Sequence, residues 1–183
     1  MTQAVSLPHI EPHAELFPHG ADVGVRGIGP SRASAFEQAA LALTLAITDP
    51  VGIACQDKVE VTCEAPSDVF LLLDWLNSLI YEMAVRRVVF GRFAVSIDGH
   101  RLHGRAWGEP IDRLRHMPAV EPKGATLTAL KVETRGDGAW IAQCIVDLGK
   151  DGESDESVAA ASGVELGMVP GTRRGNARAR GDL

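Results

Sequence analysis

The stretch Val88-Val89-Phe90-Gly91-Arg92-Phe93-Ala94-Val95-Ser96-Ile97 decides the fold class of this chain. Its β-branched and aromatic residues are typical of a strand. The stretch runs into Asp98-Gly99, a pair that favours a tight hairpin turn, so a return strand is expected over residues 100–108. The centre of the chain therefore predicts an antiparallel hairpin.

Further strands are predicted on both sides of this hairpin. Residues 59–63 alternate apolar and polar side chains, the pattern of a half-buried strand. A second hairpin is expected from residues 125–134 and 139–148, which the turn Gly136-Asp137-Gly138 would join.

Two segments repeat their apolar residues at three- and four-residue steps, which predicts helices. The first covers residues 31–47, with Ser31 placed to cap its first turn, and the second covers residues 68–84, with Ser67 as its N-cap. Strands that come in runs, rather than in strict alternation with helices, favour an α+β fold. We expect two helices packed on a mainly antiparallel sheet.

Length and composition fit one ordinary domain. The chain has 183 residues, 45% hydrophobic and 23% charged, which is the usual globular balance. Its net charge of −6 argues against a simple nucleic-acid binder, because phosphate neutralisation needs clustered Lys and Arg. The start of the chain lacks the features of an export signal and no apolar run is long enough to span a membrane, so we expect a cytoplasmic protein without a membrane partner.

The composition also predicts three parts of the chain. Residues 1–14 are expected to form a flexible N-terminal segment, residues 15–148 the folded domain, and residues 149–183 a flexible tail. From Gly149 onward there is no aromatic residue and little apolar surface to offset the entropy of ordering. The three cysteines have no CxxC spacing and are expected to be reduced and buried.

The segment Phe17–Gly29 holds a high density of glycines around one aspartate, Asp22. A dinucleotide fingerprint fails here, because its third glycine would fall on Arg32. Two interpretations remain open. Asp22 either contributes to a cation site or lies in a strand–turn–strand unit, where it accepts local amide hydrogen bonds.

Asp147 and Lys123 are the other candidates for chemistry. Asp147 ends an apolar strand, where a carboxylate would raise its pKa, find a partner or bind a metal. Asp22 and Asp147, with backbone oxygens and waters, would suit a hard cation such as calcium or magnesium. Lys123, at a strand entry, could contact a phosphate or be an ordinary exposed lysine.

Several segments together resemble the archease family, and they occur in the family's order. These segments are His19-Gly20-Ala21-Asp22-Val23-Gly24, the helix over residues 35–43 ending in Ile47-Thr48-Asp49, Leu72-Leu73-Asp74-Trp75-Leu76-Asn77-Ser78-Leu79-Ile80-Tyr81, Gly108-Glu109-Pro110-Ile111-Asp112, Lys123-Gly124-Ala125-Thr126 and Val146-Asp147-Leu148.

The resemblance implies a helper protein rather than an enzyme. Its partner would be an RNA ligase that joins a 3′-phosphate or cyclic phosphate end to a 5′-hydroxyl end in tRNA splicing or RNA repair. The helper promotes guanylylation of the ligase from GTP and repeated turnover, so that RNA and GTP are contacted indirectly, through the ligase. A chaperone-like role is also implied.

The same resemblance assigns roles to residues. It implies a calcium-like divalent ion, Ca²⁺, at Asp22, Asp147 and the chain position of Leu148, with Lys123 required for ligase activation. His19 and Glu109 are expected to support the site. The chain departs from the family pattern after Lys123, where Thr126-Leu127-Thr128 replaces Thr-Tyr-His, and it continues beyond Leu148.

Two rival functions stay open at this level. One is a metal-dependent phosphate-ester hydrolase, for which no general base is evident. The other is an interaction module without chemistry.

Overall fold

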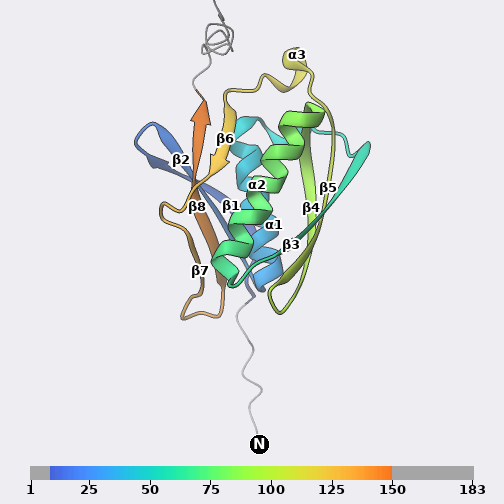
Figure 1. Ribbon diagram of the computed structural model, residues 1–183. Helices are drawn as coiled ribbons and strands as arrows, with labels where there is room; N and C mark the ends of the chain where they lie inside the picture. Colours follow the sequence, from blue (N-terminus) through green and yellow to red (C-terminus); the bar gives the residue numbers. More distant parts are fainter. Residues whose placement is uncertain (1–8, 150–183) are drawn as a thin grey trace, which may run out of the picture. The chain divides into compact units, whose positions relative to one another are not determined.

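The computed structural model describes residues 9–149 (Figure 1). The elements in chain order are β1 (His13–His19), β2 (Asp22–Gly29), α1 (Arg32–Ile47), a 3-10 turn η1 (Pro50–Gly52), β3 (Asp57–Glu64), α2 (Asp68–Arg86), β4 (Val88–Asp98), β5 (Arg101–Pro110), α3 (Arg113–His116), β6 (Glu121–Ala125), β7 (Lys131–Thr134) and β8 (Trp140–Gly149). The predicted tail from residue 150 onward, and residues 1–8, lie outside the described residues.

The strands form two antiparallel sheets with α1 and α2 between them (Figure 1). One sheet has the order β1-β2-β8-β6, with β7 also paired to β8, and the other has the order β3-β5-β4. Helix α1 contacts β2 and β8 on one side and β4 on the other, while α2 contacts β3, β5 and β6. The α+β class is confirmed, and the expected sheet is divided into two because each helix has an apolar surface on both sides.

The glycines of β2 are explained by the helix beside them. A Cβ atom at Gly27 would lie 2.0 Å from the carbonyl oxygen of Ala35, so only glycine lets β2 approach α1 this closely. The helix begins as predicted, because the Ser31 hydroxyl accepts a hydrogen bond from the Ser34 amide at 3.1 Å. The dense glycines of this segment therefore serve helix–sheet packing.

Helix α2 carries the largest fully buried side chain among the described residues, Trp75. Its buried residues are Leu71, Leu72, Trp75, Leu76, Leu79, Ile80 and Met83. Ser67 occupies the N-cap position without making a side-chain cap hydrogen bond. The helix ends where Arg87 adopts a left-handed conformation with φ of 53°, two residues beyond the predicted end.

Three local expectations are wrong. The strand predicted over residues 125–134 is divided, because β6 ends at Ala125 and the Thr126 hydroxyl instead donates to the carbonyl of Ile145 at 3.0 Å. β1 begins at His13, inside the segment expected to be flexible. Cys63 and Cys144 are buried as expected, but Cys55 is exposed.

In the part of the chain that the structure describes, no helix is long and apolar enough to cross a membrane.

Candidate functional site

Asp22 and Asp147 are brought together by the pairing of β2 with β8. The antiparallel register pairs Val23 with Val146, and one step further along it Asp22 lies opposite Asp147. On the other side, β1 pairs His19 with Asp22 across the tight β1–β2 turn, in which Gly20 has φ of +63°. Residues 125 positions apart in the chain thus share one row at the end of the sheet.

The surroundings of Asp147 differ from the expectation. Val146 and Cys144 are fully buried against the helices, whereas Asp147 is exposed. Side chains alternate along a strand, so Asp147 shares the outward face of the sheet with Asp22. Asp147 is therefore not the buried carboxylate in need of a partner that the sequence predicted.

The third site residue, Lys123, lies on the strand next to Asp147. β6 pairs Pro122 with Leu148 and Gly124 with Asp147, so the register shift between them leaves Lys123 as an extra residue in a β-bulge. Its side chain is 53% exposed and its Nζ lies 3.7 Å from Glu121 Oε2. A weak contact of this kind leaves the ammonium available to a ligand.

Asn77 holds this strand in place, a role that the sequence patterns did not reveal. Its side-chain amide donates to the carbonyl of Ala125 at 3.2 Å, and its side-chain oxygen accepts from the Ala125 amide at 2.9 Å. The two bonds tie β6 to α2 and so position the Lys123 bulge. The sequence signal that could have indicated this role is the position of Asn77, a polar residue between the apolar residues of a predicted helix.

Leu148 and Glu109 do not supply carboxylates to this row. The Leu148 side chain packs against the core and β8 continues to Gly149, so Leu148 has only its backbone carbonyl to offer. Glu109 lies in β5 of the other sheet and is 3% exposed. It accepts hydrogen bonds from the Ala54 amide at 2.6 Å and from Arg115, and its Oε1 is 3.3 Å from His116 Nε2. Its expected supporting role is replaced by a structural one.

The Glu109 network predicts a pH-dependent stability. Hydrogen bonds, first from Arg115 and then from the Ala54 amide, hold the pKa of Glu109 at about 2, below the ordinary value of 4.5. A depressed carboxyl pKa stabilises the fold above pH 4.5, and this stabilisation is lost as pH falls toward about 2. We expect Glu109→Gln to flatten the fall in urea midpoint over this range, while exposed Glu121→Gln leaves it unchanged. An equally steep fall in Glu109→Gln would contradict this origin.

The two aspartates fit part of a cation site. Neither carboxylate accepts a side-chain hydrogen bond or forms an ion pair within residues 9–149. Over the same residues, no group of three or more His, Cys, Asp or Glu is close enough to hold one metal. Calcium takes six to eight oxygen ligands, so backbone carbonyls and water would have to complete the set. His19 shares the row but does not extend the pair to a three-ligand group.

The buried thiols offer no nucleophile. Burial raises the pKa of Cys144 to about 12 and also raises that of Cys63. Both therefore remain protonated at neutral pH.

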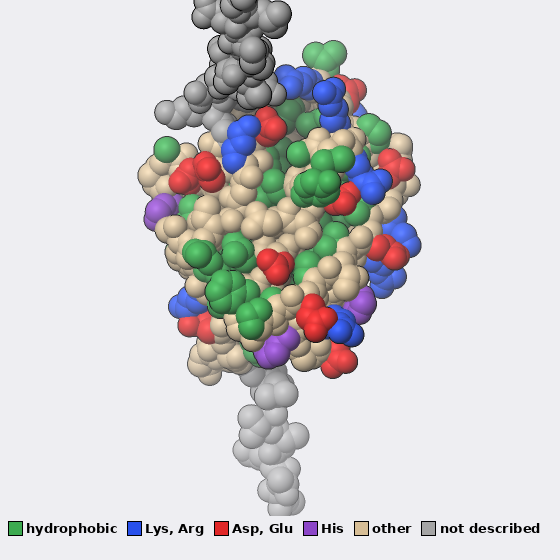
Figure 2. Space-filling model, viewed as in Figure 1, with side chains coloured by type: hydrophobic (Ala, Val, Ile, Leu, Met, Phe, Trp, Pro, Cys, Tyr) green, Lys and Arg blue, Asp and Glu red, His purple; other side chains and the backbone are tan. Residues whose placement is uncertain are grey.

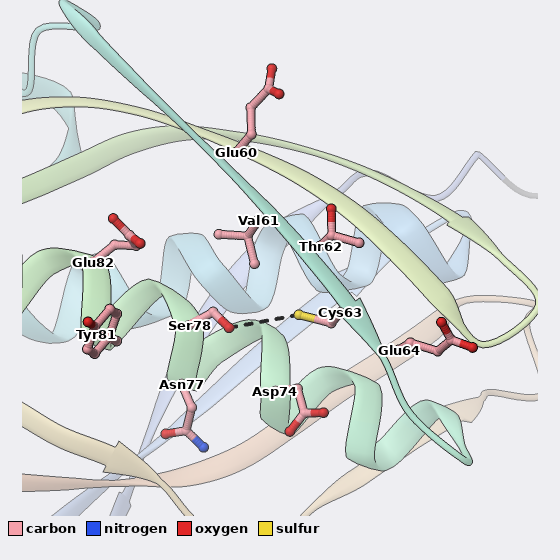
Figure 3. Close-up of a pocket in the computed structure, with 10 residues that line it drawn as sticks. All are labelled: Glu60, Val61, Thr62, Cys63, Glu64, Asp74, Asn77, Ser78, Tyr81 and Glu82. Carbon is pink, nitrogen blue, oxygen red and sulfur yellow. Dashed lines mark hydrogen bonds between the residues drawn. The ribbon is translucent and has the colours of Figure 1, made fainter.

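A separate groove of about 560 Å³ lies between β3 and α2 (Figure 3). Asp74 and Glu82 of α2 contribute carboxylates to it, whereas Glu60 and Glu64 of β3 border it with side chains that point away (Figure 3). The Cys63 thiol lies 3.9 Å from the Ser78 hydroxyl. None of the candidate site residues predicted from the sequence lines this groove.

Together these features define an α+β domain in which two sheets enclose two helices and one sheet ends in a pair of aspartates beside a lysine bulge. The archease protein family matches residues 15–148. The archease of Pyrococcus furiosus is 36% identical over 138 residues, covering 73% of this chain and 97% of the relative. That of Pyrococcus abyssi is 34% identical over the same length.

A solved structure with the same fold supports the family match. The solution structure of protein 1598 of Methanobacterium thermoautotrophicum has a TM-score of 0.63 and 31% identity, covering 74% of this chain and 98% of that one. The chain belongs to the archease family, which confirms the resemblance that its motifs indicated.

Proposed function

We propose that this protein is a helper of a GTP-dependent RNA ligase that joins 3′-phosphate and 5′-hydroxyl RNA ends, in cytoplasmic tRNA splicing or RNA repair. It acts on the ligase protein by promoting its guanylylation and repeated turnover, and it contacts RNA and GTP through the ligase. The observation that carries the proposal is the row at the sheet end, where Asp22 faces Asp147 and the Lys123 bulge follows on the next strand.

With a divalent ion bound, the residues of this row would present positive charge to phosphate groups. Asp22 and Asp147 would hold a divalent ion, Ca²⁺, with the Leu148 carbonyl and water as further oxygen ligands. Such an ion supplies the largest local positive charge, which suits phosphate oxygens. Lys123 adds an ammonium that donates charge-assisted hydrogen bonds to the same kind of group.

Reconstitution tests the proposal most directly. Ligase, GTP and RNA ends are combined at limiting ligase, with and without this protein, and ligated RNA and guanylylated ligase are both measured. We expect several turnovers only when the protein is present. Equal turnover without it would refute the helper role, and release of phosphate from esters by the protein alone would favour a hydrolase.

Lys123→Ala is expected to remove most of the stimulation while leaving the fold intact. An exposed strand lysine contributes little to the core, but its charge is placed to meet phosphate. Guanylylation of the ligase is the activity to measure, and circular dichroism checks the fold.

Lys131→Ala is a matched control for this variant. Lys131 is also a half-exposed strand lysine with a glutamate two residues away, but it lies on β7 and its ion pair with Glu133 is closer, at 2.6 Å. If the Lys123 and Lys131 variants stimulated the ligase equally, Lys123 would have no special role in ligase activation.

A further inference from the structure

The outward face of the β3-β5-β4 sheet carries a row of aromatic and cationic side chains. The register pairs Trp107 of β5 with Lys58 of β3 on one side and with Arg92 of β4 on the other. Side chains that are paired across strands point to the same face. This face is the outer one, because the alternate residues Leu102 and Ala106 of β5 are fully buried against the helices.

A β-bulge places Arg92 in this row. The β4–β5 register shifts between Phe90 and Arg92, which makes Gly91 the extra residue. Phe90 is fully buried, and the insertion turns Arg92 outward opposite Trp107. Gly91 has no room for a side chain, since a Cβ there would lie 2.9 Å from that of Ile53. Bulges commonly re-aim a side chain, and this one directs a guanidinium over an indole.

The guanidiniums lie against the indole ring. The Arg92 Cζ lies 4.2 Å from the Trp107 ring centroid, and that of Arg105 lies at 5.8 Å. Within residues 9–149 neither arginine forms an ion pair, and Arg92 has no acidic residue opposite it in the register. Glu60 lies opposite Arg105 across the strands and is paired with Lys58 at 2.7 Å, so it balances part of the charge of these two residues. Along the right-hand rim of Figure 2, the side of this sheet, Lys and Arg side chains are interspersed with Asp and Glu side chains.

The opposite end of the same face is different. There Arg101 is bonded to Glu64 at 2.7 Å and pairs across the strands with Asp98, so its charge is balanced. Between the two ends lie Thr62, His103 and Ser96, which are exposed and polar. The face therefore has one aromatic end, where Lys58, Arg92 and Arg105 outnumber the single acid Glu60, and this end continues into neutral hydrogen-bonding groups.

We propose that this row, Lys58, Arg92, Arg105 and Trp107, is a contact surface for single-stranded RNA. A base would stack on the Arg92–Trp107 pair, since bases stack on aromatic rings and on guanidinium planes. The guanidiniums would bind the phosphates on either side of that base. The hydroxyls of Thr62 and Ser96 are placed to meet ribose hydroxyls further along the strand. An acidic peptide would use the charges but leave the stacking surface without a partner.

This inference goes beyond the proposed function, in which RNA is held by the ligase, and rests on it only for the choice of RNA over DNA. The surface lies on the outward face of the sheet that does not contain Asp22 and Asp147. RNA binding is therefore measured without ligase and without calcium. A failure to bind RNA would leave the helper role untouched, and a failure to stimulate the ligase would leave this surface untouched.

The test is fluorescence anisotropy of the full chain with a labelled mixed-sequence RNA of about 12 nucleotides, within the usual site size for such surfaces. We expect salt-dependent binding together with quenching of tryptophan fluorescence. Trp107→Ala and Arg92→Ala should each raise the Kd about tenfold, as expected for loss of one stacked base. Arg92→Lys keeps the positive charge but removes the planar guanidinium that would stack on the base, so a rise in Kd smaller than that of Arg92→Ala is expected.

Arg101→Ala is the matched control, because it removes an arginine from the same strand and face. Its ion pair with Glu64 predicts a change in Kd of no more than about twofold. Absence of binding by the unaltered chain, equal loss in Arg101→Ala, or undiminished binding in Trp107→Ala would each overturn the proposal. Stronger binding of an acidic peptide or of DNA than of RNA would also overturn it.

Discussion

Trp75→Ala is expected to destabilise the domain by about 3–5 kcal/mol, the usual cost of removing a buried aromatic side chain. Trp75 is fully buried and joins three elements. Its indole Nε1 donates to the Phe36 carbonyl of α1 at 3.3 Å, and its ring meets that of Phe93 of β4 edge-on at 6.4 Å. Domains have only about 5–15 kcal/mol of total stability, so this one change removes a large share.

The ring of Trp75 also occupies the space above a glycine. A Cβ atom at Gly104 of β5 would lie 2.2 Å from the indole, so the strand and the ring are fitted to each other. Alanine at position 75 would leave a cavity over Gly104 that the rigid strand cannot fill. Urea unfolding should show a lower midpoint with an unchanged slope.

Trp107→Ala is the matched control, because it removes the same type of side chain from the surface instead of the core. Trp107 lies on the outward face of the sheet, where substitutions usually change stability by less than about 0.5 kcal/mol. Similar losses in the two variants would contradict the assignment of Trp75 as the central core residue.

If Asp22 and Asp147 hold calcium as proposed, calcium should raise the melting temperature, and Asp22→Asn and Asp147→Asn are each expected to abolish this rise. A ligand at a hundred times its Kd stabilises the folded state by about 2.7 kcal/mol, which corresponds to roughly 5–10 °C for a chain of this size. Either substitution removes one of the two carboxylates that are proposed to bind the ion. Differential scanning calorimetry with and without calcium measures the effect.

The sign of the change should reverse without calcium. Like charges directly opposite each other on neighbouring strands are destabilising, so each Asn variant should then melt at or above the unaltered protein. Asp98→Asn, at the end of β4 in the other sheet, serves as the control and should keep the full calcium response. A calcium response retained in both site variants would refute the cation site.

The sequence by itself determined the local elements. The two long helices were predicted within about two residues, because cap residues and apolar repeats act over one or two turns. The hairpin after residue 97 was predicted for the same reason, since a two-residue turn depends on the conformations of its own residues. Its turn residues are Gly99 and His100, one position later than the predicted Asp98-Gly99. The four-residue helix α3 was not predicted, since it is too short to show an apolar repeat. Asp22, Asp147 and Lys123 were selected as candidates from their settings and from the family resemblance.

Only the tertiary structure decided how these residues meet. The facing of Asp22 and Asp147, the bulge that holds Lys123 and the bulge that turns Arg92 over Trp107 all depend on strand register. Register is set by pairing between distant segments, and a shift of one residue moves every side chain to the other face. The exposure of Asp147 and the enclosure of Glu109 depend on the same long-range packing, which periodicity along one segment does not contain.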